Sequence, residues 1–255
     1  MRLQSRPRFR GGAVFGFSDL FAAAKAVRAV GQSGLYPSNL RVIDNQEAGN
    51  NSINNYEETL LILAFESADH PVEAWMTRAI ELILDHGGRR HHDESGALTW
   101  RTAFIRMPYM RELTVPLGVI NDTFESAVTW DKFEEFHVAV SAATAEAIKE
   151  ATGTAGTLST RFTHVYPDGP APYYTFNASG TQSRLIEQWR HIKSRASDAV
   201  LAAGGTITHH HAVGRDHMPW YREQRPMLFG CALEAVKRAL DPTGILNPGV
   251  LIGRG

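Results

Sequence analysis

The pattern of apolar and polar positions predicts helices and strands that are mixed along the chain. Apolar residues recur at the spacing of amphipathic helices in four long segments, which are 20–30, 72–88, 129–153 and 183–205. Short apolar or alternating runs predict strands at 11–17, 38–44, 60–65, 115–128, 158–166, 171–178 and 206–214, of which the last runs on into a loop. We expect two short helices within 215–240, and a turn, an apolar plug and a second turn in 241–249.

This order of elements predicts an α+β fold in which an antiparallel sheet carries helices packed on one face. Ser18 and Asp19 can cap the helix 20–30, and Thr129 or Asp131 is expected near the N-cap of the helix 129–153. The first ten residues contain four arginines and no apolar face. We therefore expect 1–10 to be a tail or linker, and 11–255 to form the folded domain.

Composition and charge exclude several classes of protein. The 26 basic and 27 acidic residues give a formal net charge of -1, so no general basic field exists to bind nucleic acid. The single cysteine, Cys231, excludes an internal disulfide framework and a multi-cysteine metal site. No uncharged apolar run of about 18 residues is present, and the basic N-terminus lacks the apolar stretch of a secretory signal. These features favour a cytoplasmic protein.

Common nucleotide and hydrolase motifs are absent from the sequence. It has no Walker A motif, no GxGxxG after a strand, no GxSxG and no HExxH. Any chemistry must therefore come from other residues.

The run His209-His210-His211 is the most unusual string in the sequence. On a strand, His209 and His211 would point to one face and His210 to the other. A metal site would need a further ligand, for example from His164, His217, His91 or His92. A second interpretation is that the histidines have a structural role as polar groups at the end of a sheet. We favour a catalytic or anion-binding role, because imidazoles titrate near neutral pH, and we predict no metal site.

Two arginines and a tyrosine pair also stand in apolar surroundings. Arg41 lies inside an expected strand, and Arg106 lies in the apolar segment AFIRMPYM. Either could form a structural salt bridge instead of facing a site. Tyr173 and Tyr174 are adjacent on an expected strand, so at most one faces a given side, and aromatic packing is their alternative role. Cations, a phenol and imidazoles together suit a phosphate- or carboxylate-bearing substrate and proton transfer.

Longer strings extend this interpretation. The chain contains, in this order, the strings SNLRVIDNQE, AFIRMPYMREL, FESAVTWDKF, RFTHVYPDGPAPYYTF, GGTITHHHAVGRDHMPW and DPTGILNPGVL. Together they resemble the C-terminal half of the alkylglycerone-phosphate synthase family, within the vanillyl-alcohol-oxidase-type superfamily of flavoproteins. The resemblance covers roughly residues 7 to 252. The ending DPxGxLNPG is common to many FAD-linked oxidases, whereas HHHAVG in place of GEHGxG is specific to the synthase branch.

The resemblance implies a fold, a reaction and roles for individual residues. The fold would be the ferredoxin-like cap domain of FAD-linked oxidases. The reaction would exchange the acyl group of acyl-dihydroxyacetone phosphate for a fatty alcohol, with FAD as cofactor. Catalytic roles would belong to Tyr173, His209, His210 and His211, substrate binding to Arg41 and Arg106, and contact with the flavin to Asn247 and His211. The tyrosine strand is more polar than in animal relatives, which bears on alkyl-chain preference.

The resemblance also predicts partners and leaves alternatives open. The family's N-terminal FAD-binding domain is not within this sequence, so we expect a fragment, a truncated reading frame or half of a split enzyme. Peripheral membrane contact and a homodimer are further expectations. The alternatives are a FAD-linked oxidoreductase of a hydroxy acid or alcohol, and an inactive binding module.

Overall fold

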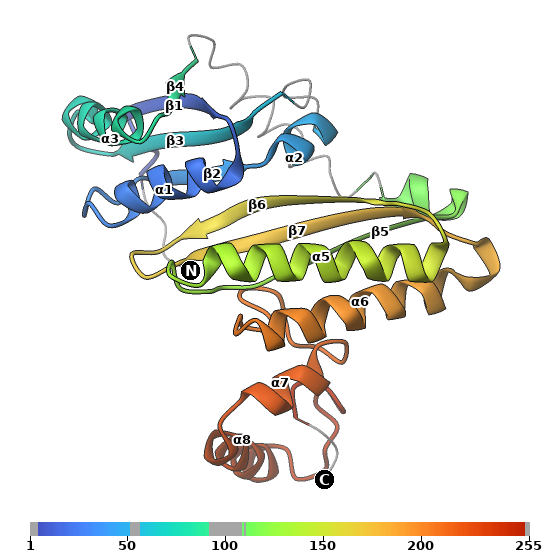
Figure 1. Ribbon diagram of the computed structural model, residues 1–255. Coiled ribbons are helices and arrows are strands. Elements are labelled where there is room, and N and C mark those ends of the chain that lie inside the picture. Colours follow the sequence, from blue (N-terminus) through green and yellow to red (C-terminus); the bar gives the residue numbers. More distant parts are fainter. Residues whose placement is uncertain (1–4, 52–56, 92–108, 110, 253–255) are drawn as a thin grey trace.

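Seven strands form one antiparallel sheet in a computed structural model of the chain, which describes residues 5–51, 57–91, 109 and 111–252 (Figure 1). The strand order is β4-β1-β3-β2-β6-β7-β5. Their bounds are β1 Phe9–Phe17, β2 Asn39–Ile43, β3 Thr59–Ser67, β4 Arg89–Arg90, β5 Val119–Glu125, β6 Thr157–Val165 and β7 Pro170–Ser179. Every described pair is antiparallel, as the sequence predicts.

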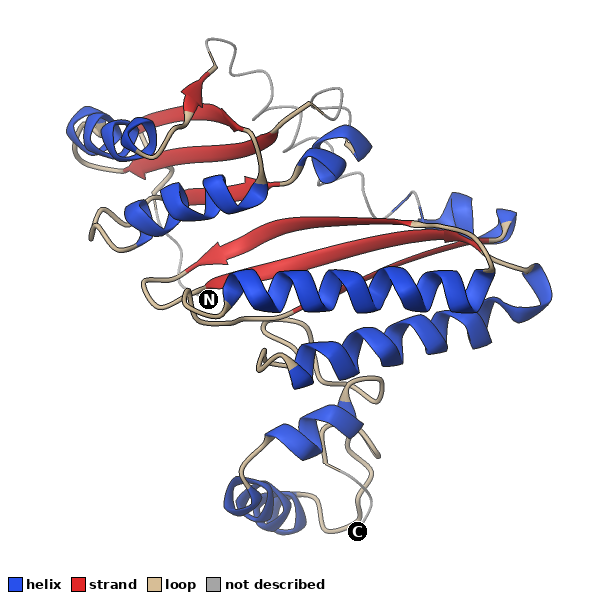
Figure 2. Cartoon of the chain, viewed as in Figure 1, coloured by secondary structure: helices blue, strands red, loops and turns tan. Residues whose placement is uncertain are grey.

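Four helices cover one face of the sheet (Figure 2). They are α1 Leu20–Gly31, α3 Glu73–Asp85, α5 Phe133–Thr152 and α6 Leu185–Ala202. Their apolar stripes and the sheet residues beneath them form one large core, which includes Phe15, Leu61 and Phe162. The α+β fold with helices packed on one face is therefore confirmed.

The opposite face of the sheet is largely open. A short helix, α2 Asn45–Asn50, lies there and contributes Ala48 to a small apolar cluster with Val14, Ile43, Leu60 and Ile62. Asp44 caps α2 by accepting a hydrogen bond from the backbone N–H of Glu47 (2.7 Å). We did not predict this helix, because its six residues contain one apolar side chain, too few to show a helical period.

The sheet has a narrow seam between β2 and β6. Only one pair of residues, Ile43 and Arg161, is aligned between these two strands. Asp44 extends the join, because its backbone N–H donates to the Thr160 carbonyl (2.9 Å) and its carboxylate accepts from the Thr160 N–H (2.6 Å). The backbone pairing that joins the two halves of the sheet is therefore short.

Two further helices, α7 Met218–Gln224 and α8 Met227–Leu240, lie beyond α6 (Figure 1). Trp220 in α7 donates its indole N–H to Asp198 of α6 (2.7 Å), which fixes α7 in place. Among the described helices, none combines the length and apolar character that crossing a membrane requires.

Several boundaries differ from the sequence-based predictions. β1 begins at Phe9, so the expected tail 1–10 includes two residues that pair with β3. The N-cap of α5 is Lys132, which directly follows the expected Asp131, and no side chain caps the helix there. The predicted apolar plug in 241–249 is wrong as a buried element, because Ile245 and Leu246 are exposed. The predicted strand at 206–214 is wrong as well, since this segment is a loop.

Candidate functional site

Strand alternation divides the tyrosine pair of β7 between the two faces of the sheet. Tyr174 is fully buried under the helices, where His137 of α5 bonds its hydroxyl (3.1 Å). Tyr173 faces the open side and aligns with Glu125 on β5 and Arg161 on β6. The expectation that only one of the two tyrosines faces a site therefore agrees with the fold.

Arg161 lies over the ring of Tyr173, with its guanidinium carbon 3.9 Å from the ring centroid. The same guanidinium pairs with the Glu47 carboxylate of α2, and both side chains are 3% exposed. The Tyr173 hydroxyl donates to the Thr123 hydroxyl on β5 (2.9 Å). These contacts hold the phenol at a defined position on the open face.

A β-bulge turns His164 toward the same face. The register of β6 against β7 shifts between Phe162 and His164, so one extra residue is inserted and the alternation of side chains reverses. The His164 ring consequently lies 5.2 Å from the rings of both His209 and His210.

The histidine run is held by the buried carboxylate of Glu125. One oxygen, Oε1, accepts the backbone N–H groups of His209 (3.0 Å), His210 (2.5 Å) and His211. The rings of His210 and His211 then lie against Tyr173, with His211 edge-on to the phenol at 5.2 Å between centroids. Because the backbone curls around one acceptor, the side chains do not alternate as they would on a strand, and the predicted split of the run between two faces is wrong.

Burial and neighbouring charges shift the pKa values of this group. Burial acts to raise the pKa of Glu125, but the three backbone N–H donors and His211 outweigh it and hold the pKa below its ordinary value. Burial lowers the pKa of His211. Burial, together with the neighbouring His209 and His210, lowers the pKa of His164. The structure thus favours an ionised Glu125 carboxylate beside neutral rings of His164 and His211.

The remaining predicted site residues are Arg41, Arg106 and Asn247. Arg41 lies on the open face, close enough to Arg161 that this charge adds to burial in lowering the Arg41 pKa. Arg106 lies outside the described residues. Asn247 lines a cavity with Lys237 and Asp241, and neither Tyr173 nor the histidine run lines that cavity. The roles assigned to all of these residues stay predictions.

Sequence reasoning missed Glu125, Arg161 and Glu47. Arg161 is a charge inside an expected strand, so the criterion that selected Arg41 could have found it. Glu125 and Glu47 gave no comparable signal, since their partners are distant in sequence.

Within the part of the chain that the structure describes, two trios of side chains could hold a metal ion. They are His164 with His209 and His210, and Glu125 with His210 and His211, and the ligand atoms within each trio lie within 4.8 Å of one another. These imidazoles and the carboxylate are ordinary zinc ligands. The expectation that the site uses no metal stays a prediction.

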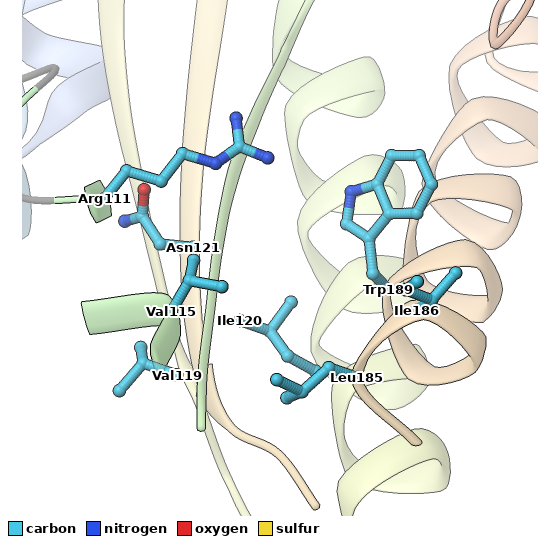
Figure 3. Close-up of a pocket in the computed structure, with 8 residues that line it drawn as sticks. All are labelled: Arg111, Val115, Val119, Ile120, Asn121, Leu185, Ile186 and Trp189. Atoms are coloured by element: carbon cyan, nitrogen blue, oxygen red, sulfur yellow. The ribbon is translucent and has the colours of Figure 1, made fainter. Parts of the chain in front are cut away.

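A separate cavity of about 310 Å³ lies between β5 and the start of α6. Its lining is mostly aliphatic, and Figure 3 shows Arg111 and Trp189 facing it from different elements. Ile120, which points into the helix-side core, forms part of its wall. Of the predicted site residues that the structure describes, none lines this cavity.

Comparisons with known proteins agree with the fold. The chain is 29% identical over 194 residues to the alkyldihydroxyacetonephosphate synthase of Trypanosoma brucei brucei, covering 76% of this chain and 31% of that protein. It is 33% identical over 162 residues to the synthase of Caenorhabditis elegans, covering 62% of this chain and 27% of that protein. This chain therefore spans about a third of the length of these curated relatives.

Solved structures show the same architecture. An alkyldihydroxyacetonephosphate synthase superposes with a TM-score of 0.72 at 17% identity, over 95% of this chain and 45% of that one. The 4-ethylphenol oxidase from Gulosibacter chungangensis gives a TM-score of 0.66 at 11% identity, over 99% of this chain and 55% of that one. The family model for the C-terminal domain of FAD linked oxidases matches residues 6–251. The chain therefore belongs to the family of FAD linked oxidases, C-terminal domain.

Proposed function

We propose that this chain is the substrate-side domain of an FAD-dependent alkylglycerone-phosphate synthase-like enzyme. In that reaction a fatty alcohol replaces the acyl group of acyl-dihydroxyacetone phosphate. The observation that carries the proposal is the gathering of Tyr173, the histidine run and two arginines on one open sheet face. The similarity to named synthases supports the choice of reaction.

The residues of this face suit the substrate chemically. Arg41 supplies a cationic fork of the kind that binds phosphate or carboxylate, whereas Arg161 is buried against Glu47 and holds Tyr173 in place. Tyr173 and the imidazoles can donate or accept protons, which removal of a proton and departure of a carboxylate both require. Arg106 remains a second proposed anion ligand.

The open face also fits one wall of a flavin pocket. It combines hydrogen-bond donors, aromatic rings and a buried carboxylate oxygen, and none of the long helices among the described residues covers it (Figure 2). FAD, when bound, supplies the electron chemistry that amino-acid side chains cannot provide. His211 is the residue of this face that we assign to contact with the flavin, and Asn247 is a more distant candidate. We infer that another part of the enzyme binds most of the cofactor.

The test is alkyl transfer with FAD, a supplied FAD-binding domain of a relative, acyl-dihydroxyacetone phosphate and a labelled long-chain alcohol. Tyr173→Phe should lower the rate about 10²-fold or more, because it removes one proton-transfer group. Tyr36→Phe is the matched control, since Tyr36 is exposed and lies far along the chain from Tyr173 and the histidine run. Absence of labelled ether product under all such conditions would contradict the proposal.

A second candidate is an FAD-linked oxidoreductase of a hydroxy acid or alcohol. It is favoured by a 23% identity over 92 residues to an uncharacterized FAD-linked oxidoreductase of Escherichia coli. Bleaching of the flavin absorption by a 2-hydroxy acid would support this candidate over alkyl transfer. Membrane contact and self-association remain further proposals for either enzyme.

A further inference from the structure

Glu125 uses its two carboxylate oxygens for different purposes. It ends β5 directly opposite Tyr173, and its side chain is 1% exposed. Oε1 accepts the three consecutive backbone N–H groups of the histidine run and lies 3.3 Å from the Thr208 hydroxyl. This crowding of donors fixes the orientation of the carboxylate.

The second oxygen, Oε2, is buried and lies against Nδ1 of His210. Among the described residues no donor is aligned with Oε2 for a hydrogen bond, and Nδ1 of His210 also lies 3.3 Å from Nδ1 of His209. The rings of His209 and His211 are more distant, because their Nδ1 atoms lie 3.9 Å and 4.0 Å from the carboxylate oxygens. His209 also uses Nε2 to bond the Tyr166 hydroxyl (3.0 Å).

We propose that Glu125 is a positioning residue that keeps the proton of neutral His210 on Nδ1 and so leaves Nε2 free to accept a proton from a bound substrate. This inference rests on the proposed function, because it selects one histidine of the run for proton transfer there.

Elementary chemistry connects the geometry to this role. An ionised carboxylate only accepts hydrogen bonds, so the ring nitrogen against it must carry the hydrogen. When Nε2 takes up a substrate proton, His210 becomes a cation, and the adjacent carboxylate balances the new charge. His210 is 41% exposed, whereas His209 is 17% exposed, so a ligand reaches His210 more easily.

Glu125→Gln separates charge from position. The three backbone N–H groups still require an oxygen acceptor, which holds the amide oxygen at the position of Oε1. The amide NH₂ group must then face Nδ1 of His210 and donate to it. The neutral ring should therefore change from the Nδ1–H form to the Nε2–H form, with little change in the fold.

The measurement is ¹⁵N NMR of histidine side chains in this chain, without FAD or substrate, above the pH at which the rings are charged. We expect neutral His210 to be mainly Nδ1–H in the wild type and mainly Nε2–H in Glu125→Gln. The control is Glu150→Gln, which removes the carboxylate from the exposed pair with His191 (2.9 Å) and should leave His210 unchanged. A wild-type His210 that is mainly Nε2–H would overturn the proposal even if the variant did not fold. The same tautomer in wild type and Glu125→Gln would also overturn it.

Activity separates this inference from the proposed function. In the assembled enzyme, Glu125→Gln should lower kcat about 10²-fold with KM within a few-fold of the wild type. A change of tautomer without any alkyl transfer would support the positioning role and count against the reaction. Alkyl transfer with full kcat in Glu125→Gln would support the reaction and overturn the positioning role.

Discussion

Acid should destabilise this fold through His137, which lies between α5 and the sheet. Its ring stacks on Tyr174 (5.8 Å between centroids) and contacts Phe21 and Phe133. Burial in these aromatic surroundings lowers the pKa of His137 from 6.5 to about 4. The folded protein therefore resists a proton that the unfolded chain accepts.

The sign and size of the effect follow from this difference. Above pH 6.5 the ring is neutral in both states, and its contribution to stability is fully present. As the pH falls from 6.5 toward 4, only the unfolded chain takes up the proton, so the free energy of unfolding decreases. One pH unit is worth about 1.4 kcal/mol, which gives a loss of about 2 kcal/mol at pH 5 and about 3 kcal/mol at pH 4.

Another group opposes this trend, so the assay must compare variants. Burial raises the pKa of Asp44 to about 7, and its carboxyl stabilises the fold as the pH falls over the same range. His137→Phe keeps an aromatic ring in place and removes only the titration of His137. Loss of the partner of the Tyr174 hydroxyl lowers stability equally at every pH.

The assay is urea denaturation of wild type and His137→Phe between pH 7.5 and pH 5. We expect the wild type to lose about 2 kcal/mol relative to the variant over this interval. Stability curves that stay parallel within about 0.5 kcal/mol would refute the reasoning, because they would show that His137 takes up its proton equally in both states.

Three further predictions concern the seam and a turn. Arg161→Met leaves the Glu47 carboxylate buried without its cation and should lower the free energy of unfolding by about 3–5 kcal/mol in urea, and adding Glu47→Gln should recover much of the loss. Equal stability of the single and double variants would contradict this. Asp44→Asn should remove the decrease in stability that the raised pKa predicts for the wild type as the pH rises through 7, measured by urea midpoints at pH 5.5 and 8. Gly169→Ala should lower the melting temperature, because the new Cβ would lie 1.9 Å from the Val128 carbonyl oxygen; an unchanged melting temperature would show that this turn can move aside.

Most of the regular elements were predictable because each carries its own local signal, which the short α2 and β4 lack. The alternation in β7, with Tyr174, Phe176 and Ala178 buried and Tyr173 and Thr175 partly exposed, follows directly from strand geometry. The helices over the core likewise show an apolar stripe that needs no knowledge of the partner.

The site was harder to predict, because its shape depends on residues far apart in the sequence. Glu125 lies 84 positions before His209, and its buried carboxylate turns an apparent strand into a loop. The bulge at β6 decides that His164 joins the histidines, and a change of one residue in register leaves no trace in composition. Residue types therefore indicated the chemistry, while the geometry required the fold.

The narrow seam between β2 and β6 has a consequence for folding kinetics. Strands β1–β4 come from one continuous stretch of chain and β5–β7 from a later one, so contacts within each half join residues nearer in sequence. Such local contacts form faster than those between distant segments, and we expect the halves to form as separate cooperative units that dock last. Arg41 comes from one half, whereas Tyr173 and the histidines come from the other. The capacity to bind a ligand on the open face should therefore appear only at docking, and it would report on the final step of folding.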